Sequence, residues 1–185
     1  MSVCQARSPR VSPEWIVAGL FLVVCQAGML TISTEFEYGR DVLARPVGQL
    51  IGLMCLSGIV YLTAVLCLRR PFATDRHGWA WVIGVGIAMR LLAFPAAPMM
   101  DDDYHRYLWD GALVAHGYSP YAHTPDEIAG DAVAPELVEL AAASGGVLDR
   151  VNHPWLNSIY PPFAQLAFAA AHLVSPWHIM GLRVT

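Results

Sequence analysis

Long runs of apolar residues alternate along the chain with short charged stretches. The first run, residues 15–33, and the second, residues 47–68, contain no charged residue. Each has about 20 residues, the length of helix that crosses the hydrocarbon core of a bilayer. The pattern therefore predicts two transmembrane helices within the first 70 residues.

Two further apolar runs are less regular. The third extends from about residue 79 to residue 100 and contains Arg90, and the fourth, residues 159–174, is short and opens with the Tyr-Pro-Pro at Tyr160. Proline is tolerated in the first turn of a helix, where its missing N–H would have had no partner. The fourth run fits either a spanning helix or a helix that only dips into the membrane. The sequence thus predicts an all-α, multi-spanning membrane protein with about four transmembrane helices.

A signal peptide is the alternative for the first run, because Arg7 and Arg10 precede it. The apolar part of a signal peptide is shorter, about 7–15 residues, and ends at a cleavage site with small residues. The length of this run favours a helix that is retained.

Composition supports a membrane protein. Hydrophobic residues make up 56% of the 185 residues and charged residues 14%, against about 25% charged in a typical soluble domain. No basic patch suggests a nucleic-acid partner, and no Cys/His spacing suggests a zinc site.

The arginines indicate which side each loop faces, since Lys and Arg are enriched in short cytoplasmic loops. Arg7 and Arg10 precede the first run, and Arg69, Arg70 and Arg76 follow the second. Both stretches should be cytoplasmic, so the hairpin at 34–46 and the loop at 101–158 should face outward. That loop holds ten acidic residues and two arginines, in agreement with this orientation.

These signals divide the chain into four parts in an inner cell membrane. Residues 1–14 form a cytoplasmic tail and residues 15–100 three transmembrane helices. Residues 101–158 form an extracytoplasmic loop, and residues 159–185 the fourth helix with the end of the chain.

Three adjacent carboxylates, Asp101, Asp102 and Asp103, open the outer loop. Carboxylates held close together suit a general base or a cation site. Aspartates are also good helix N-caps and favour a helix N-terminus through its dipole. The residue pattern alone leaves both interpretations open.

A helix is predicted directly after the triplet. Asp103, Arg106 and Asp110 are spaced three and four apart, so they share one face. We expect a short amphipathic helix along the outer membrane surface, with its acidic face over the helix bundle, although simple membrane anchoring would explain the same pattern. The neighbouring apolar and aromatic face carries Tyr104, Tyr107, Leu108 and Ala112.

Three strings in this region resemble multi-spanning glycosyltransferases of the GT-C class. They read DDDYHRYLWDG, GYSPYAHTPDE and VNHPWLNSIYPPFAQLAF, in this order. They are most similar to the bacterial mannosyltransferase-like branch, whose members use polyprenyl-phosphate sugars. That branch carries an Asp-Asp pair ahead of Arg-Tyr-x-Trp-Asp-Gly, then an Asn-Pro-Tyr-like turn and a Tyr-Pro-Pro helix opening.

The resemblance covers roughly residues 80–175. Asp102 and Asp103 match the aspartate pair, and Ser119 stands where the branch usually has asparagine. The matched positions that would support the site structurally are Tyr107, Trp109, Asp110 and Tyr160.

The resemblance implies transfer of a sugar, with mannose expected, from a lipid-linked donor to a glycan, lipid or protein acceptor at the outer membrane face. The acceptor hydroxyl must lose a proton, which calls for a positioned carboxylate. Asp103 is the candidate base. Asp102 would orient it or hold a divalent cation together with it.

The departing phosphate gains charge, which calls for a cation. Arg106 is the first candidate, and pairing with Asp110 at i+4 is its alternative role. Arg150 and His153 are weaker candidates. Arg90 lies eleven residues before Asp101, about 16 Å of continuous helix, and could line the donor groove or extend toward the interface.

Members of the branch have about twice as many helices as this sequence predicts. The resemblance therefore implies an N-terminal part that is inactive alone and needs C-terminal helices, in the same chain or supplied separately. The rival function is a non-enzymatic membrane protein, such as a transporter subunit or assembly partner with a cation-binding acidic loop. No acidic residue lies within an apolar run, which disfavours transport.

Overall fold

A computed structural model describes residues 11–67, 76–99, 101–130 and 133–185, and all regular structure among them is helical. The all-α prediction is therefore confirmed for these residues. The chain divides into two compact units, residues 1–99 and residues 100–185. Arg7, Arg10, Arg69 and Arg70, on which the predicted orientation partly rests, lie outside the described residues.

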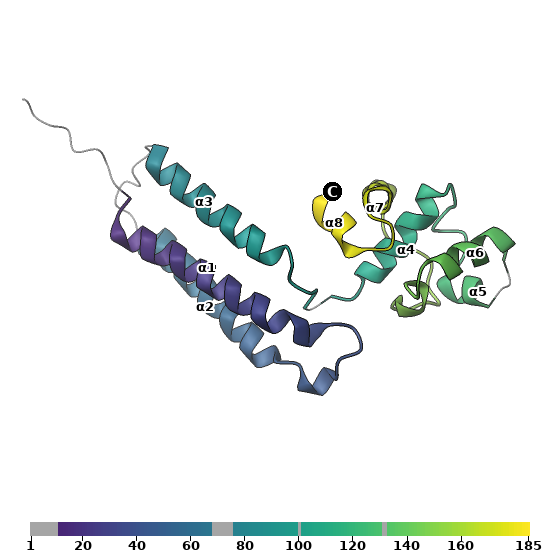
Figure 1. The fold of residues 1–185 in the computed structure, drawn as a ribbon, viewed down its shortest axis with the longest axis horizontal. Coiled ribbons are helices and arrows are strands. Elements are labelled where there is room, and N and C mark those ends of the chain that lie inside the picture. The colour runs from purple at the N-terminus through teal and green to yellow at the C-terminus, as the bar shows by residue number, and fades with distance from the viewer. Residues whose placement is uncertain (1–10, 68–75, 100, 131–132) are drawn as a thin grey trace, which may run out of the picture. The chain divides into compact units, whose positions relative to one another are not determined.

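The described residues of the first unit form three long helices, which are labelled in Figure 1. They are α1 (Pro13–Ser33), α2 (Val47–Cys67) and α3 (Arg76–Ala93), with two short 3₁₀ turns, η1 (Thr34–Phe36) and η2 (Val42–Ala44), between α1 and α2. Helix α1 packs against both α2 and α3. The indole Nε1 of Trp81 donates to the carbonyl oxygen of Trp15 at 3.1 Å, which joins α3 to the start of α1.

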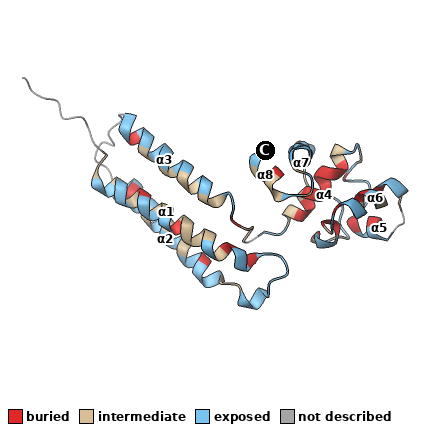
Figure 2. Ribbon diagram, in the orientation of Figure 1, coloured by how far each residue is buried: buried red, intermediate tan, exposed pale blue. Residues whose placement is uncertain are grey.

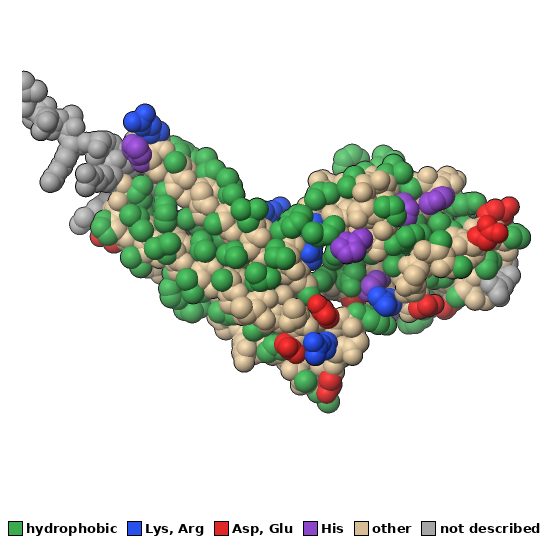
Figure 3. All heavy atoms as spheres, in the orientation of Figure 1, with side chains coloured by type: hydrophobic (Ala, Val, Ile, Leu, Met, Phe, Trp, Pro, Cys, Tyr) green, Lys and Arg blue, Asp and Glu red, His purple; other side chains and the backbone are tan. Residues whose placement is uncertain are grey.

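Helices α1 and α2 are long and apolar enough to cross a membrane, and both lie where the apolar runs predicted them. Within their most apolar windows only 17% and 11% of the residues are buried. A core helix of a soluble protein would be mostly buried. Figure 2 shows few buried residues along these helices, and Figure 3 shows hydrophobic side chains over the visible face of the unit.

Helix α3 is shorter than predicted. It ends at Ala93 instead of extending to about residue 100, because Pro95 and Pro98 follow and the residue before a proline disfavours the helical conformation. Arg90 thus lies in the last turn, exposed, and not 16 Å deep in a continuous helix. A cation at this place interacts favourably with the C-terminal end of the helix dipole.

The second unit is built around α4 (Tyr104–Ala115) and α7 (Pro162–Val174), which pack against each other. Between them come α5 (Pro125–Ala129), α6 (Pro135–Ala143) and the 3₁₀ turn η3 (Leu148–Arg150). Helix α8 (Ile179–Val184) ends the chain and packs on α7. The apolar core joins α4 to this loop region through Leu108, Trp109, Leu113, Ile128, Leu137, Leu140, Val147, Leu148 and Val151.

Helix α4 is the central helix of its unit and not a surface helix. Arg106 is 7% exposed and Asp110 is 1% exposed, and Figure 2 shows α4 largely buried. The predicted interfacial amphipathic helix is wrong on this point. The polar face has the predicted spacing, but it is covered by a later part of the same loop.

Helix α7 has 13 residues, about 20 Å of helix. The hydrocarbon core is about 30 Å thick, so α7 by itself is too short to span it. The described residues therefore contain two helices that meet the length and composition of a membrane span, and the four-span topology is not confirmed.

Candidate functional site

Three separated parts of the second unit converge on the segment that leads into α7, residues 151–161, here called the connecting segment. Helix α4 lies on one side of it. The stretch around Tyr121 also contacts it, since the Tyr121 hydroxyl donates to the carbonyl oxygen of Tyr160 at 2.6 Å and the Asn157 amide donates to the carbonyl oxygen of Tyr121 at 2.9 Å. The backbone N–H of Asp126 donates to the Pro154 carbonyl at 3.1 Å.

The polar face of α4 points at the connecting segment and the start of α7. Asp103 accepts a hydrogen bond from the Tyr160 hydroxyl at 3.1 Å, and the Arg106 guanidinium donates to the carbonyl oxygens of Asn152 and His153 at 3.3 and 3.0 Å. Asp110 bonds to Ser158 and Gln165. All these partners lie between residues 152 and 165, so the three polar residues share one face as their spacing predicts.

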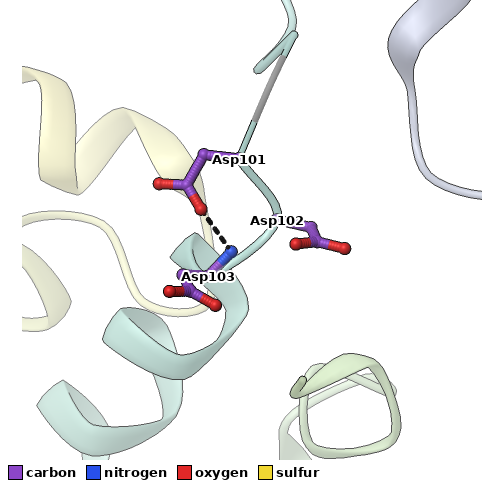
Figure 4. Close-up of side chains that lie close together, drawn as sticks. All are labelled: Asp101, Asp102 and Asp103. Carbon is purple, nitrogen blue, oxygen red and sulfur yellow. Dashed lines mark hydrogen bonds between the residues drawn. The ribbon is translucent and has the colours of Figure 1, made fainter. Parts of the chain in front are cut away.

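The three aspartates differ in their surroundings (Figure 4). Asp101 and Asp102 are exposed, and Asp103 is half-buried. A carboxylate oxygen of Asp101 accepts from the backbone N–H of Asp103 at 2.8 Å, and the Asn152 amide donates to Asp102. The side chain of Asp102 points away from those of Asp101 and Asp103 (Figure 4).

Asp103 occupies the N-cap position of α4, but its side chain makes no capping hydrogen bond. Its Oδ2 atom instead accepts from the Tyr160 hydroxyl. The capping interpretation of the triplet therefore does not account for the Asp103 carboxylate. Asp103 is the one aspartate of the three that is fixed by an aromatic hydroxyl from the end of the connecting segment.

The triplet offers oxygen ligands of the kind that Mg²⁺ and Ca²⁺ prefer. One oxygen from each aspartate lies within 4.8 Å of the others, about the widest separation that two ligands of one Ca²⁺ can have at 2.3–2.6 Å each. Asp101 and Asp103 lie on the same side, while Asp102 faces away (Figure 4). The oxygens of all three aspartates are within this separation, so the predicted pair Asp102 and Asp103 remains close enough to hold one cation.

Arg106 does not have the predicted role in this structure. Its guanidinium is buried and bonded to two backbone carbonyls, so it is not presented to a lipid phosphate. Its interaction with Asp110 is through charge and not through a hydrogen bond: the positive charge of Arg106 opposes the rise in the pKa of the Asp110 carboxyl, whose hydrogen bonds come from neutral partners. Arg106 therefore has a structural role. It donates to backbone carbonyls at the start of the connecting segment, which lie outside any helix or strand, so that no regular backbone ladder satisfies them.

Two of the other predicted phosphate ligands lie near the site in the second unit. Arg150 is exposed at the end of η3, and His153 is exposed with its ring 5.1 Å from that of Trp155. His153 has a positive φ of 51°, which is uncommon outside glycine and marks a constrained turn. Arg90 belongs to the first unit.

Aromatic rings hold the connecting segment against both long helices. The ring of Tyr107 stacks on Phe168 at 4.7 Å and meets Tyr160 edge-on at 5.1 Å. Trp109 is fully buried in the core. Tyr107 and Tyr160 thus pack where α4, the connecting segment and α7 meet, and Trp109 lies in the core; their supporting role in a site stays a prediction.

Sequence reasoning missed the residues that complete the site. Ser158 and Gln165 bond to Asp110, and Asn152 bonds to Asp102. Serine, glutamine and asparagine are ordinary loop and helix residues, so nothing in the local pattern marks them. The proline pair after Tyr160 gave the one usable signal, because it fixed where the connecting segment ends and α7 begins.

His105 is a buried histidine beside the triplet, 2% exposed. Burial, and secondarily the positive charge of Arg150, lower its pKa to about 4, while Asp102 opposes the shift. An unfolded histidine titrates near 6.5, so between about pH 6.5 and pH 4 the unfolded chain takes up a proton that the folded chain does not. Stability conferred by the neutral ring is therefore lost as the pH falls through this window.

We expect His105→Gln, which cannot titrate, to reduce the loss of thermal stability between pH 7 and pH 5. The unfolding midpoint of detergent-solubilised protein, followed by tryptophan fluorescence, measures this. His123→Gln is the matched control, because His123 is exposed. Equal pH dependence in wild type and His105→Gln would show that His105 does not titrate in this way.

The chain matches no protein-family model, no curated protein and no solved structure.

Proposed function

We propose that this chain carries the catalytic loop of a membrane glycosyltransferase that uses a polyprenyl-phosphate sugar, with mannose as the expected sugar. The observation that supports the proposal best is the convergence of three separated segments on one place. The strings around residues 101–111, 117–127 and 151–168 carry the GT-C resemblance, and the first two each contact the third at the connecting segment.

Asp103 is the proposed general base. Its Oδ2 atom is held by Tyr160, and no described residue bonds to Oδ1. In the proposed reaction the acceptor hydroxyl gives its proton to this carboxylate, and the acceptor oxygen bonds to the anomeric carbon. The bond from that carbon to the phosphate oxygen breaks, and polyprenyl phosphate leaves with the electron pair.

Arg150 and His153 are the proposed contacts of the departing phosphate, since Arg106 is buried. Both side chains can donate hydrogen bonds to phosphate oxygens, and both are exposed at or beside the connecting segment. The Arg106 guanidinium, by contrast, is buried and donates to two backbone carbonyls.

The apolar surface of α7 supports a position at the membrane. Phe163 and Leu173 are 84% and 74% exposed on a helix whose other face packs on α4. Exposed apolar surface on this scale marks contact with lipid or with other helices. We propose that α7 dips into the outer leaflet, where a polyprenyl chain would also lie.

The proposed orientation places the first residues and Arg76 in the cytoplasm, and residues 101–158 outside. A single cysteine introduced at Glu136 should react with a membrane-impermeant thiol reagent in intact cells, and one at Arg76 should not. Both positions are exposed, so accessibility within the protein does not separate them.

The four native cysteines are first replaced, because Cys55 is exposed. Permeabilised cells provide the control in which both positions react. The reverse labelling pattern in intact cells would overturn the orientation and with it the proposed chemistry at the outer face.

The function itself is tested with membranes that contain the protein expressed from its complete gene. Labelled polyprenyl-phosphate mannose should lose its sugar to an acceptor, and polyprenyl phosphate should accumulate in equal amount. Other polyprenyl-phosphate hexoses test the sugar. Absence of transfer from every donor would favour the non-enzymatic function with a cation-binding loop.

A further inference from the structure

A buried hydrogen-bond network begins at Asp110, about two turns along α4 from Asp103. The Oδ2 atom of Asp110 accepts from the Ser158 hydroxyl at 2.5 Å and from the Gln165 amide at 3.0 Å. The Gln165 amide also donates to the Ser158 oxygen at 2.6 Å. All three side chains are at least nine-tenths buried, so the network ties α4, the connecting segment and α7 together in the interior.

This network is costly as a purely structural device. Both donors go to one carboxylate oxygen of Asp110, while its Oδ1 atom and the Oε1 atom of Gln165 have no hydrogen-bond partner in the part of the chain that the structure describes. Burial raises the pKa of the Asp110 carboxyl, against the hydrogen bonds from Gln165 and Ser158. Packed apolar residues usually stabilise such a position at least as well. Asp110 therefore calls for a role other than stability.

The network continues to the candidate base. The Ser158 oxygen also accepts from the backbone N–H of Tyr160 at 3.4 Å, and the Tyr160 hydroxyl donates to Asp103 at 3.1 Å. The chain of contacts therefore runs from Asp110 through Ser158 and Tyr160 to Asp103. Every link is a hydrogen bond, and each constrains the direction of the next group.

We propose that Asp110 is a positioning residue, which acts through Ser158 to hold the Tyr160 hydroxyl on the Asp103 carboxylate. The effect on catalysis rests on the proposed transferase function, whereas the structural link does not. Asp110 touches no reacting atom in this proposal. It works as a hydrogen-bond acceptor, so an amide oxygen in the same place should serve nearly as well.

The structural link is tested by fluorine NMR of the protein labelled with 3-fluorotyrosine. The chain has seven tyrosines, and the Tyr160 signal is assigned by its loss in Tyr160→Phe. Ser158→Ala and Asp103→Asn should each shift this signal, because one removes the anchor of Tyr160 and the other changes its acceptor. Ser57→Ala, in α2, should not. An unchanged Tyr160 signal in Ser158→Ala would overturn the proposal.

The catalytic effect is tested in the donor assay with the protein from the complete gene. Ser158→Ala and Asp110→Ala should lower kcat on the order of tenfold to hundredfold, as small misplacements of a catalytic group do, with KM for the donor nearly unchanged. Asp110→Asn should retain most of the turnover, because its oxygen still accepts from Ser158.

The outcomes separate the two ideas. Absence of turnover in the wild-type protein would contradict the proposed transferase function. The NMR result would then still test the structural link by itself. Normal turnover in Ser158→Ala would overturn the positioning role. This variant also keeps the test decisive if Asp110→Ala fails to fold. An Asp110→Asn variant as inactive as Asp110→Ala would show that the charge of Asp110 matters and would overturn it as well.

Discussion

Asp103→Asn should lower the turnover of the protein expressed from its complete gene by about 10²–10⁴-fold, the usual loss when a general base is removed. The amide oxygen can still accept from the Tyr160 hydroxyl, so the hydrogen bond seen at 3.1 Å is preserved. What is lost is the ability to take the proton of the acceptor hydroxyl. Stability should hardly change, because the Asp103 side chain makes no capping bond at α4.

Asp101→Asn is the matched control. Asp101 is exposed, and an asparagine oxygen can equally well accept the hydrogen bond that its carboxylate accepts from the backbone N–H of Asp103. We expect this variant to keep turnover within a few fold of wild type. Initial rates measured side by side, with membrane insertion and thermal midpoint as checks, decide the matter. Small and equal effects at the two positions would end the case for Asp103 as the base.

The apolar helices were the most predictable part of the fold. Residues 15–33 and 47–68 were predicted, and α1 and α2 occupy Pro13–Ser33 and Val47–Cys67. The signal is local, since an uncharged run of this length favours one helix whatever surrounds it. The end of α3 is also predictable in principle, because Pro95 and Pro98 lie inside the third apolar run.

The burial of α4 could not be predicted from its own sequence. Its three-and-four spacing of Asp103, Arg106 and Asp110 looks the same whether the face meets water, lipid or protein. The partners that cover it are between 46 and 57 residues away along the chain. Periodicity identifies a helix face but not what covers it. The prediction of an interfacial helix was therefore the simplest one, and it was wrong because the polar face is buried.

The residues of the candidate site also fall into those that the sequence indicates and those that it does not. Asp103, Tyr107 and Tyr160 could be predicted as candidates because they belong to strings with a recognisable order. Ser158 and Gln165 carry no such mark, and their role depends on where the connecting segment places them against Asp110. The sequence makes Arg106 a candidate phosphate ligand because it lies beside aspartates on one helix face. In the structure its guanidinium donates to two backbone carbonyl oxygens instead.

Gly111→Ala should loosen the contact between α4 and α7. Glycine inside a helix normally costs about 0.5–1 kcal/mol relative to alanine, so an open position would gain stability from this change. At Gly111 a Cβ atom would overlap the backbone carbonyl of Phe168. A backbone group cannot rotate away as a side chain can, so α7 must shift, and overpacking of this kind costs about 1–3 kcal/mol.

Hydrogen exchange measured by mass spectrometry tests this locally. Peptides that cover α4 and α7 should exchange roughly five- to hundredfold faster in Gly111→Ala, because the local opening free energy falls by about that cost. Gly84→Ala in α3 is the control, since a Cβ there meets nothing within 4 Å, and it should leave these peptides unchanged. The shift of α7 would also separate Gln165 from Asp110 and Phe168 from Tyr107, so turnover should fall together with protection. Unaltered protection of both helices in Gly111→Ala would mean that α4 and α7 do not meet at this glycine, and the site built between them would have to be abandoned.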